Sequence, residues 1–234
     1  MKNVTVVKVT SAQMELTLSP AMVQAHKPEC VILDEWAAFL VDAASNTYSQ
    51  FGEDVLIEKL FDRIGTENEW CFEVGASDGL IYSNTKMLRD LQWSAVLIES
   101  SQKLIANLTN VAATEANSRV IGVEVGGDTT IDDLLEYTDA PFDMDLGVID
   151  VDGQDYWLWY DMTMFMPRVM LVEYSLRNLA RELPQRYGGG DMNYGQAGRD
   201  FIVELGKDKG YQALAATPCN VLFVLEDVLK AAGQ

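Results

Sequence analysis

An acidic turn with two glycines follows an apolar stretch, and this part of the chain is the best suited to bind a ligand. It reads Trp70-Cys-Phe-Glu-Val-Gly-Ala-Ser-Asp-Gly79, and the next apolar stretch, from Ala95, ends in Glu99. Glycine at Gly75 and Gly79 lets the backbone approach a ligand closely. An acid at the end of the second strand can accept both hydrogens of a ribose diol. Together the two segments predict a site for a nucleoside cofactor.

The spacing of the glycines separates this turn from a dinucleotide-binding turn. It reads Glu-x-Gly-x-x-x-Gly, and not the Gly-x-Gly-x-x-Gly in which a helix N-terminus holds a pyrophosphate. A wider loop that carries Glu73 and Asp78 suits a ligand with cationic groups and no phosphate, such as S-adenosylmethionine. The alternative is that the glycines serve only tight packing. Glu99 favours the ligand, because an acid at a strand end costs stability unless it is solvated or bound.

Acidic side chains also end two later apolar stretches. Asp150 and Asp152 lie two residues apart at the end of one strand, and Glu173 ends the next. The carboxyl ends of parallel strands meet at one edge of a sheet, where ligands bind. Three oxygen ligands at this edge could hold Mg²⁺ and leave room for an acceptor hydroxyl. In this interpretation Asp150 or Asp152 accepts the proton of the hydroxyl.

These three acids also have a structural interpretation. Asp150 could cap the helix that starts near Asp155, and Glu173 could pair with Arg168 or Arg177.

Two other polar residues are candidates for the site. Asn84 opens the helix after the glycine turn, where it either caps the helix or makes a polar contact near the transferred group. The single histidine, His26, lies before the regular part of the chain, so we expect the acids to carry the chemistry.

Apolar runs alternate with helical patterns from residue 48 onward. This alternation predicts an α/β fold with a mostly parallel sheet that helices cover on both faces. We expect strands over 70–74, 95–99, 119–124, 146–151, 168–173, 211–215 and 221–225, the last two as a hairpin. We expect helices over 52–64, 84–91, 103–108, 130–137, 156–165 and 198–209. Residues 1–45 form an N-terminal extension with a strand-like start and a short helix over 33–44, and residues 46–234 form the main domain.

Composition and charge limit the classes of partner. The chain has 234 residues, and 36 acids against 17 bases give a net charge of −19. Such a charge disfavours nucleic acid and an anionic membrane surface as partners. No apolar run is long enough to cross a membrane, and the start does not resemble a signal peptide. Three scattered cysteines without metal-type spacing favour a reducing cytoplasm.

The chain resembles the FkbM-type S-adenosylmethionine-dependent methyltransferases over about residues 46 to 228. The matching segments are Tyr48-Ser-Gln-Phe-Gly-Glu-Asp54, Phe72-Glu-Val-Gly-Ala-Ser-Asp-Gly79, Ser83-Asn-Thr85, Trp93-Ser-Ala-Val-Leu-Ile-Glu99, Thr130-Ile-Asp-Asp-Leu-Leu135, Ile149-Asp-Val-Asp-Gly-Gln-Asp-Tyr156, Val172-Glu-Tyr174, Lys209-Gly-Tyr211 and Cys219-Asn220. The resemblance implies a Rossmann-like class I methyltransferase fold, with a seven-stranded sheet whose last strand is antiparallel. It also implies a hydroxyl acceptor on a sugar, a glycan or a polyketide-like metabolite.

The resemblance further assigns roles to the residues of the motifs. Glu73, Gly75 and Gly79 would shape the methionine pocket, Glu99 would hold the ribose, and Gln50 and Asp54 would close over the cofactor. After Glu173 relatives often continue with Asn-Pro, whereas this chain reads Tyr-Ser-Leu-Arg177, so the acceptor cannot be carried over from the family.

Three hypotheses about function follow. The first is an O-methyltransferase for a small molecule or glycan. The second is a noncatalytic binding or structural protein that keeps the methyltransferase fold. The third, a nucleotide-dependent oxidoreductase, is disfavoured because the chain lacks Gly-x-Gly-x-x-Gly.

Overall fold

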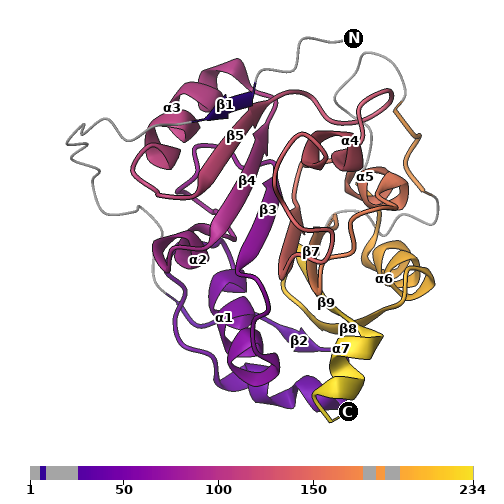
Figure 1. The fold of residues 1–234 in the computed structure, drawn as a ribbon. Helices are drawn as coiled ribbons and strands as arrows, with labels where there is room; N and C mark the ends of the chain where they lie inside the picture. Colours follow the sequence, from indigo (N-terminus) through magenta and orange to yellow (C-terminus); the bar gives the residue numbers. More distant parts are fainter. Residues whose placement is uncertain (1–5, 9–25, 176–182, 188–195, 234) are drawn as a thin grey trace.

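The protein is built on one mixed β-sheet with helices on both faces (Figure 1). The structure, a computed structural model, describes residues 6–8, 26–175, 183–187 and 196–233. The strands are β1 (Val6–Lys8), β2 (Val31–Ile32), β3 (Trp70–Val74), β4 (Ser94–Glu99), β5 (Ser118–Gly122), β6 (Leu146–Ile149), β7 (Val169–Glu173), β8 (Tyr211–Ala216) and β9 (Asn220–Leu225). The helices are the 3-10 helix η1 (Glu35–Asp42) and α1 (Glu53–Ile64), α2 (Lys86–Asp90), α3 (Gln102–Ala112), α4 (Ile131–Leu135), α5 (Asp155–Asp161), α6 (Arg199–Asp208) and α7 (Glu226–Ala231).

The strand order identifies the fold. The central part of the sheet has the order β5-β4-β3-β6-β7-β9-β8, and within it β9 is antiparallel to both of its neighbours. Without β9 this is the 3-2-1-4-5-6 order of a doubly wound sheet. The predicted α/β, Rossmann-like class I methyltransferase fold is therefore confirmed, as is the antiparallel last strand with its hairpin.

The predicted number of strands was too low. The described residues form nine strands, because β1 pairs with β5 and β2 pairs with β8, both antiparallel. These two short strands come from the extension and cover the two edges of the sheet, where backbone groups would otherwise lack partners. The boundary between an extension over 1–45 and a domain over 46–234 stays a prediction.

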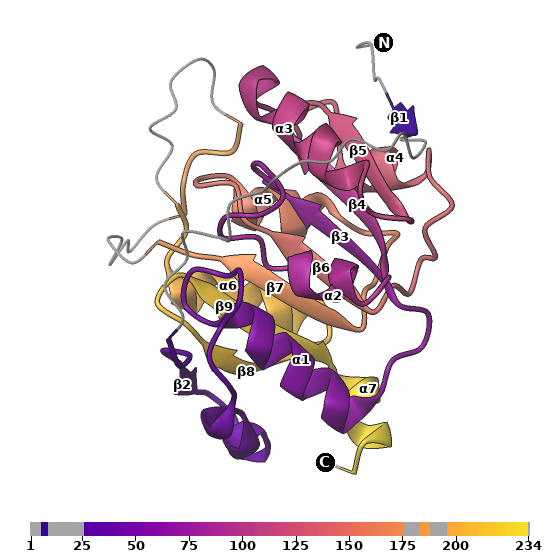
Figure 2. The ribbon, with the colours of Figure 1, turned by 90° about the vertical axis from the view of Figure 1, so that its left-hand side faces the viewer.

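Two apolar layers enclose the sheet. Successive strand residues point to opposite faces, so Cys71 packs with η1, α1, α2, α3 and α7, while Phe72 packs with α4, α5 and α6. Figure 2 shows α1, α2 and α3 toward the viewer, in front of the strands. Because both faces are covered, the strands are apolar almost throughout, which is why the sequence predicted them well.

Buried carboxylates set the ends of two helices that the sequence placed differently. The helix predicted over 84–91 begins only at Lys86, since Glu73 binds the segment before it. The helix predicted over 156–165 ends at Asp161. The carboxylate of Asp132 accepts the backbone N–H groups of residues 163, 164 and 165, and these groups are then not available to a helix.

Candidate active site

A cavity of about 200 Å³ opens at the carboxyl ends of β3, β6 and β7 and the start of β9. It is smaller than the roughly 300–1,000 Å³ of a pocket that encloses a whole drug-sized ligand, so it suits one end of such a ligand. Its lining is Gln50, Glu53, Glu73, Gly75, Ala76, Ser77, Ile81, Tyr82, Ser83, Asn84, Asp150, Asp152, Glu173 and Asn220. Five of these residues are acids, and no lysine, arginine or histidine is among them.

The glycine turn brings the ends of β3 and β6 together. Gly75 has a φ of 87°, in the left-handed region, and a Cβ there would lie 1.7 Å from the backbone oxygen of Asp150. Only glycine permits this approach. Gly79, with a φ of 79°, packs instead against Leu108 of α3. Of the two predicted glycines, Gly75 lines the cavity and Gly79 supports the turn from behind.

Glu73 positions the segment that carries Asn84. One carboxylate oxygen, Oε2, accepts hydrogen bonds from the hydroxyls of Ser83 (2.8 Å) and Thr85 (2.6 Å), and Oε1 accepts from the backbone N–H of Asn84 (2.8 Å). The N-cap of α2 is Thr85, so Asn84 does not cap the helix. Its side chain lines the cavity, where its Nδ2 lies 3.4 Å from Oδ2 of Asp150.

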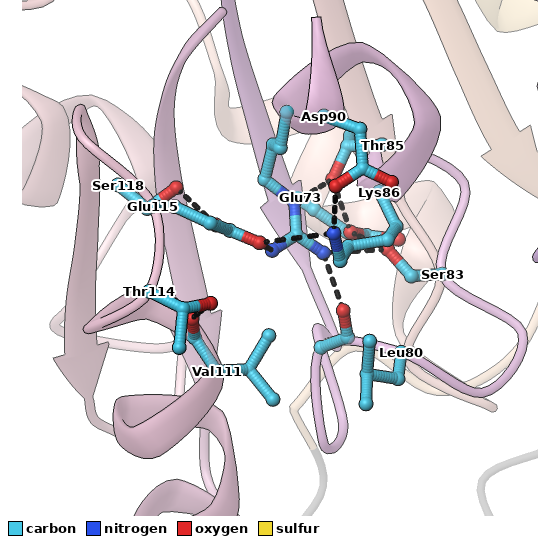
Figure 3. A network of polar contacts seen from close by, with 12 residues as sticks. Glu73, Leu80, Ser83, Thr85, Lys86, Asp90, Val111, Thr114, Glu115 and Ser118 are labelled. Carbon is cyan, nitrogen blue, oxygen red and sulfur yellow. Dashed lines mark hydrogen bonds and ion pairs between the residues drawn. The ribbon is translucent and has the colours of Figure 1, made fainter. Parts of the chain in front are cut away.

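Behind this segment lies a buried arginine that sequence analysis missed. Arg89 is 1% exposed, and its guanidinium donates to the backbone oxygen of Gly79, to the hydroxyls of Ser83 and Thr85, and to both oxygens of Glu115 at 2.8 Å. Lys86 adds a second cation, 3.5 Å from Glu115. Figure 3 shows the network between the labelled residues Glu73, Ser83, Thr85, Lys86 and Glu115. We call Glu73, Ser83, Thr85, Lys86, Arg89 and Glu115 the Arg89 cluster.

No pattern in the sequence pointed to Arg89. A charged residue in a short amphipathic helix is normally solvent-exposed. Its burial depends on Glu115, which follows α3 and lies far along the chain.

Asp150 is the predicted catalytic residue that the structure places most directly in the cavity. Its Oδ2 lies between two carboxamides, 3.4 Å from Nδ2 of Asn84 and 3.5 Å from Nδ2 of Asn220. Burial, then the charges of Asp155, Glu73 and Glu53, raises its pKa to about 7, while the bond from Asn220 opposes that rise. A carboxylate with a pKa near neutrality is suited to accept a proton.

Asp155 and Glu173 surround Asp150 with further negative charge. Burial raises the pKa of Asp155, although it accepts the backbone N–H groups of Val151 and Gly153. Burial, followed by the charges of Asp150, Asp155 and Asp152, also raises the pKa of Glu173. Among the ion pairs between described residues, none includes these side chains. We call Asp150, Asp155 and Glu173 the acid cluster.

The structure tests the alternative in which these acids cap a helix or pair with an arginine. The N-cap of α5 is Gln154, without a side-chain capping bond, so Asp150 is not the cap. Asp155 holds the loop before the helix. Arg168 pairs with Asp145 at 2.5 Å, and not with Glu173. Arg177, the other proposed partner, lies outside the described residues. Glu173 Oε2 instead accepts from the backbone N–H of Asp152 and from Nε2 of Gln196.

The geometry gives the predicted magnesium site no support. Within the part of the chain that the structure describes, no group of three or more His, Cys, Asp or Glu side chains is arranged to hold a metal ion. Asp152 contacts Glu173 through its backbone N–H at 2.9 Å.

The predicted cofactor residues near β4 lie outside the cavity lining. Both oxygens of Glu99 accept backbone N–H groups, from Ser77 (2.8 Å) and Ser101 (2.7 Å), although each carboxylate oxygen keeps a second lone pair for a ribose. Asp78 accepts the N–H groups of Leu80 and Ile81 and stabilises its own turn.

Of the two residues expected to close over the cofactor, one lines the cavity and the other is buried at the start of α1. Gln50 lines the cavity. Asp54, which is 1% exposed, accepts the backbone N–H groups of residues 47, 48 and 49 and so fixes the loop before α1.

Among the cavity residues that sequence analysis missed, Glu53 and Asn220 are buried polar residues within the motifs of the resemblance. Glu53 is fully buried and accepts the hydroxyl of Thr217 at 2.6 Å and the backbone N–H of Phe51 at 2.9 Å. Asn220 is 2% exposed and starts β9. Both were quoted as matching residues, so the resemblance was the signal that could have identified them.

Comparisons with known proteins found similarity to solved structures. No model of a protein family and no curated protein matches the chain. Similar solved structures include a SAM-dependent methyltransferase from Aquifex aeolicus (10% identity, 72% of this chain and 89% of that one, TM-score 0.43). Another is an S-adenosylmethionine-dependent methyltransferase from Clostridium acetobutylicum (10%, 74% and 90%, 0.47). A third is magnesium protoporphyrin IX methyltransferase from Synechocystis with bound SAH (12%, 74% and 81%, 0.48).

No helix among the described residues is long and apolar enough to span a membrane.

Proposed function

We propose that the protein is an S-adenosylmethionine-dependent methyltransferase of the FkbM type. The observation that carries this proposal is the charge of the cavity, whose described lining has five acids, Glu53, Glu73, Asp150, Asp152 and Glu173, and no basic residue. Buried carboxylates without a counter-charge destabilise the free protein. A ligand with an ammonium and a sulfonium relieves this cost, so the residues present fit S-adenosylmethionine.

The proposed roles follow the place of each residue on the sheet edge. The turn at Gly75, with Gln50 and Glu73 beside it, would hold the amino-acid end of the cofactor. Glu99, at the end of β4, would accept the ribose hydroxyls. When bound, the cofactor supplies a methyl group on a positively charged sulfur, and positioning against the acceptor provides much of the rate.

We further propose that the acceptor is a hydroxyl group on a sugar, a glycan or a small metabolite in the cytoplasm. A neutral hydroxyl must lose its proton as its oxygen forms the new bond to carbon. We assign that proton to Asp150, which lines the cavity and whose Oδ2 lies near the carboxamides of Asn84 and Asn220. The bound cofactor would supply the methyl group, and the electron pair of its carbon–sulfur bond would stay on sulfur.

Titration calorimetry tests the cofactor part of the proposal. We expect S-adenosylmethionine and S-adenosylhomocysteine to bind and NAD not to bind. Glu99→Ala should weaken binding of S-adenosylmethionine at least tenfold, because two hydrogen bonds to a ribose are lost, about 1–3 kcal/mol. Absence of binding by the wild-type protein contradicts the proposal.

Transfer of a labelled methyl group to a panel of hydroxyl-bearing sugars tests the catalytic part. Asp150→Asn should lower kcat by about 10²–10⁴, the usual contribution of a general base. Binding of the cofactor without any transfer by the wild-type protein favours the noncatalytic alternative.

A further inference from the structure

The β7–β9 end of the cavity contains a polar group that lacks a partner. Asn220 lines the cavity and is 2% exposed, and its Oδ1 has no hydrogen-bond partner among the described residues. Its Nδ2 has two contacts, at 3.5 Å to Oδ2 of Asp150 and at 3.1 Å to Sγ of Cys219. A buried amide oxygen without a donor costs about 1–3 kcal/mol, and a ligand with a donor would remove that cost.

Glu173 is the acid that lies opposite Asn220 on the neighbouring strand. Glu173 and Asn220 are paired directly across the antiparallel strands β7 and β9. Side chains of such a pair lie on the same face, with Cβ atoms roughly 5 Å apart. Glu173 Oε2 already accepts from Asp152 and Gln196, whereas no hydrogen bond to its Oε1 is made by the described residues.

This end of the cavity is separate from the glycine turn. The strand order runs β3-β6-β7-β9, and neighbouring strands are about 4.8 Å apart. Asn220 therefore lies on the far side of Asp150 from Gly75. The acids Asp150 and Glu173 lie beside it, and Glu53 accepts from the neighbouring side chains of Thr217 and Cys219.

We propose that a protonated amine of the methyl acceptor binds between Oδ1 of Asn220 and the carboxylate of Glu173, so that the acceptor is an amino alcohol or an amino sugar. This proposal rests on the proposed function, and it names the class of its substrate. An ammonium donates three hydrogen bonds and carries the positive charge that the cavity lining lacks. A carboxylate or phosphate at the same place would meet no positive charge in the described lining.

The test compares ligands that share their ring hydroxyls and differ at one position. Glucosamine, N-acetylglucosamine and glucose are titrated into the protein, with and without saturating S-adenosylhomocysteine, and dissociation constants are read by ligand-observed NMR. We expect glucosamine to bind at least tenfold more tightly than the other two at pH 7. Equal binding of the three sugars, or no binding of glucosamine at 20 mM, overturns the proposal.

Variants show whether the named residues cause the preference. Asn220→Leu and Glu173→Gln should each reduce the preference for glucosamine over glucose to less than threefold, and Asn220→Asp, which keeps an oxygen acceptor, should retain it. Asp227→Asn, on the exposed side of α7, is the control and should keep the wild-type ratio. If Asn220→Leu does not fold, Glu173→Gln decides alone. A preference that survives in the variants that fold overturns the proposal.

The two proposals can fail separately. If S-adenosylhomocysteine does not bind but the protein still prefers glucosamine, the proposed function fails and the amine site stands. If the cofactor binds and the protein shows no preference among the sugars, the proposed function stands and the amine site fails.

Discussion

The Arg89 cluster and the acid cluster both contain buried carboxylates, but only the Arg89 cluster contains its own positive charge. In the Arg89 cluster, Arg89 and Lys86 face Glu115, and two hydroxyls connect Arg89 to Glu73. In the acid cluster no cation of the described residues offsets the carboxylates, and burial, followed by the charges of Asp155, Glu73 and Glu53, raises the pKa of Asp150. Paired charges fix a loop, whereas buried carboxylates without a nearby cation favour the binding of a cationic ligand.

The largest expected effect comes from removing the cation of the Arg89 cluster. Arg89→Met leaves Glu115 buried without its bidentate partner, and the hydroxyls of Ser83 and Thr85 lose a donor. We expect the free energy of unfolding, measured with urea, to fall by about 3–5 kcal/mol. Lys230→Met, which removes an exposed ion pair on α7, should cost less than about 1 kcal/mol. Similar losses of unfolding free energy in both variants would show that burial of the Arg89–Glu115 pair does not determine how much it stabilises the protein.

Substitution of a carboxylate in the acid cluster should instead stabilise the free protein. The pKa of Asp150 is 3.8 in the unfolded chain and is raised to about 7 in the folded protein. The stability that the protonated form contributes is therefore lost as the pH rises through this range. Asp150→Asn should therefore stabilise the free protein by roughly 2 kcal/mol at pH 8, a value discounted for coupling to its neighbours. The gain should disappear near pH 4. Thermal or urea unfolding across this range measures it.

Asp145→Asn is the matched control for that variant. Asp145 is fully buried, but it pairs with Arg168 and accepts the backbone N–H groups of residues 67, 68 and 69. We expect this variant to lose stability at pH 8. A loss of stability in Asp150→Asn at every pH would show that Asp150 is a structural residue.

The smallest effect tests the link between the two sides of the Arg89 cluster. Thr85→Val keeps the shape of the side chain but removes the hydroxyl that donates to Glu73 at 2.6 Å and accepts from Nε of Arg89 at 3.2 Å. The expected loss in free energy of unfolding is about 1–2 kcal/mol. Thr109→Val, whose hydroxyl bonds only within its own helix, should lose less than about 0.5 kcal/mol. Equal losses would contradict the role of the link.

Local patterns in the sequence were sufficient to predict the elements that lie in a uniformly apolar environment. The strands β3, β4 and β7 were predicted within one residue because both faces of the sheet are covered, and apolar runs mark them clearly. The glycine turn was also predicted, since the φ values of Gly75 and Gly79 require glycine. The helix starting at Lys86 was placed too early, because Glu73, eleven residues before Asn84, competes for the backbone there.

For the site, the chain by itself determined which acids stand at the strand ends. Asp150 and Glu173 could be named from the sequence because parallel strands bring their carboxyl ends to one edge. Whether such an acid finds a partner is decided by residues from distant segments, and only the tertiary structure shows them: Arg168 turns to Asp145, Arg89 turns to Glu115, and Asn220 reaches Asp150 from β9. Burial and pairing depend on contacts across the whole fold, and a local pattern of residue types contains no information about them.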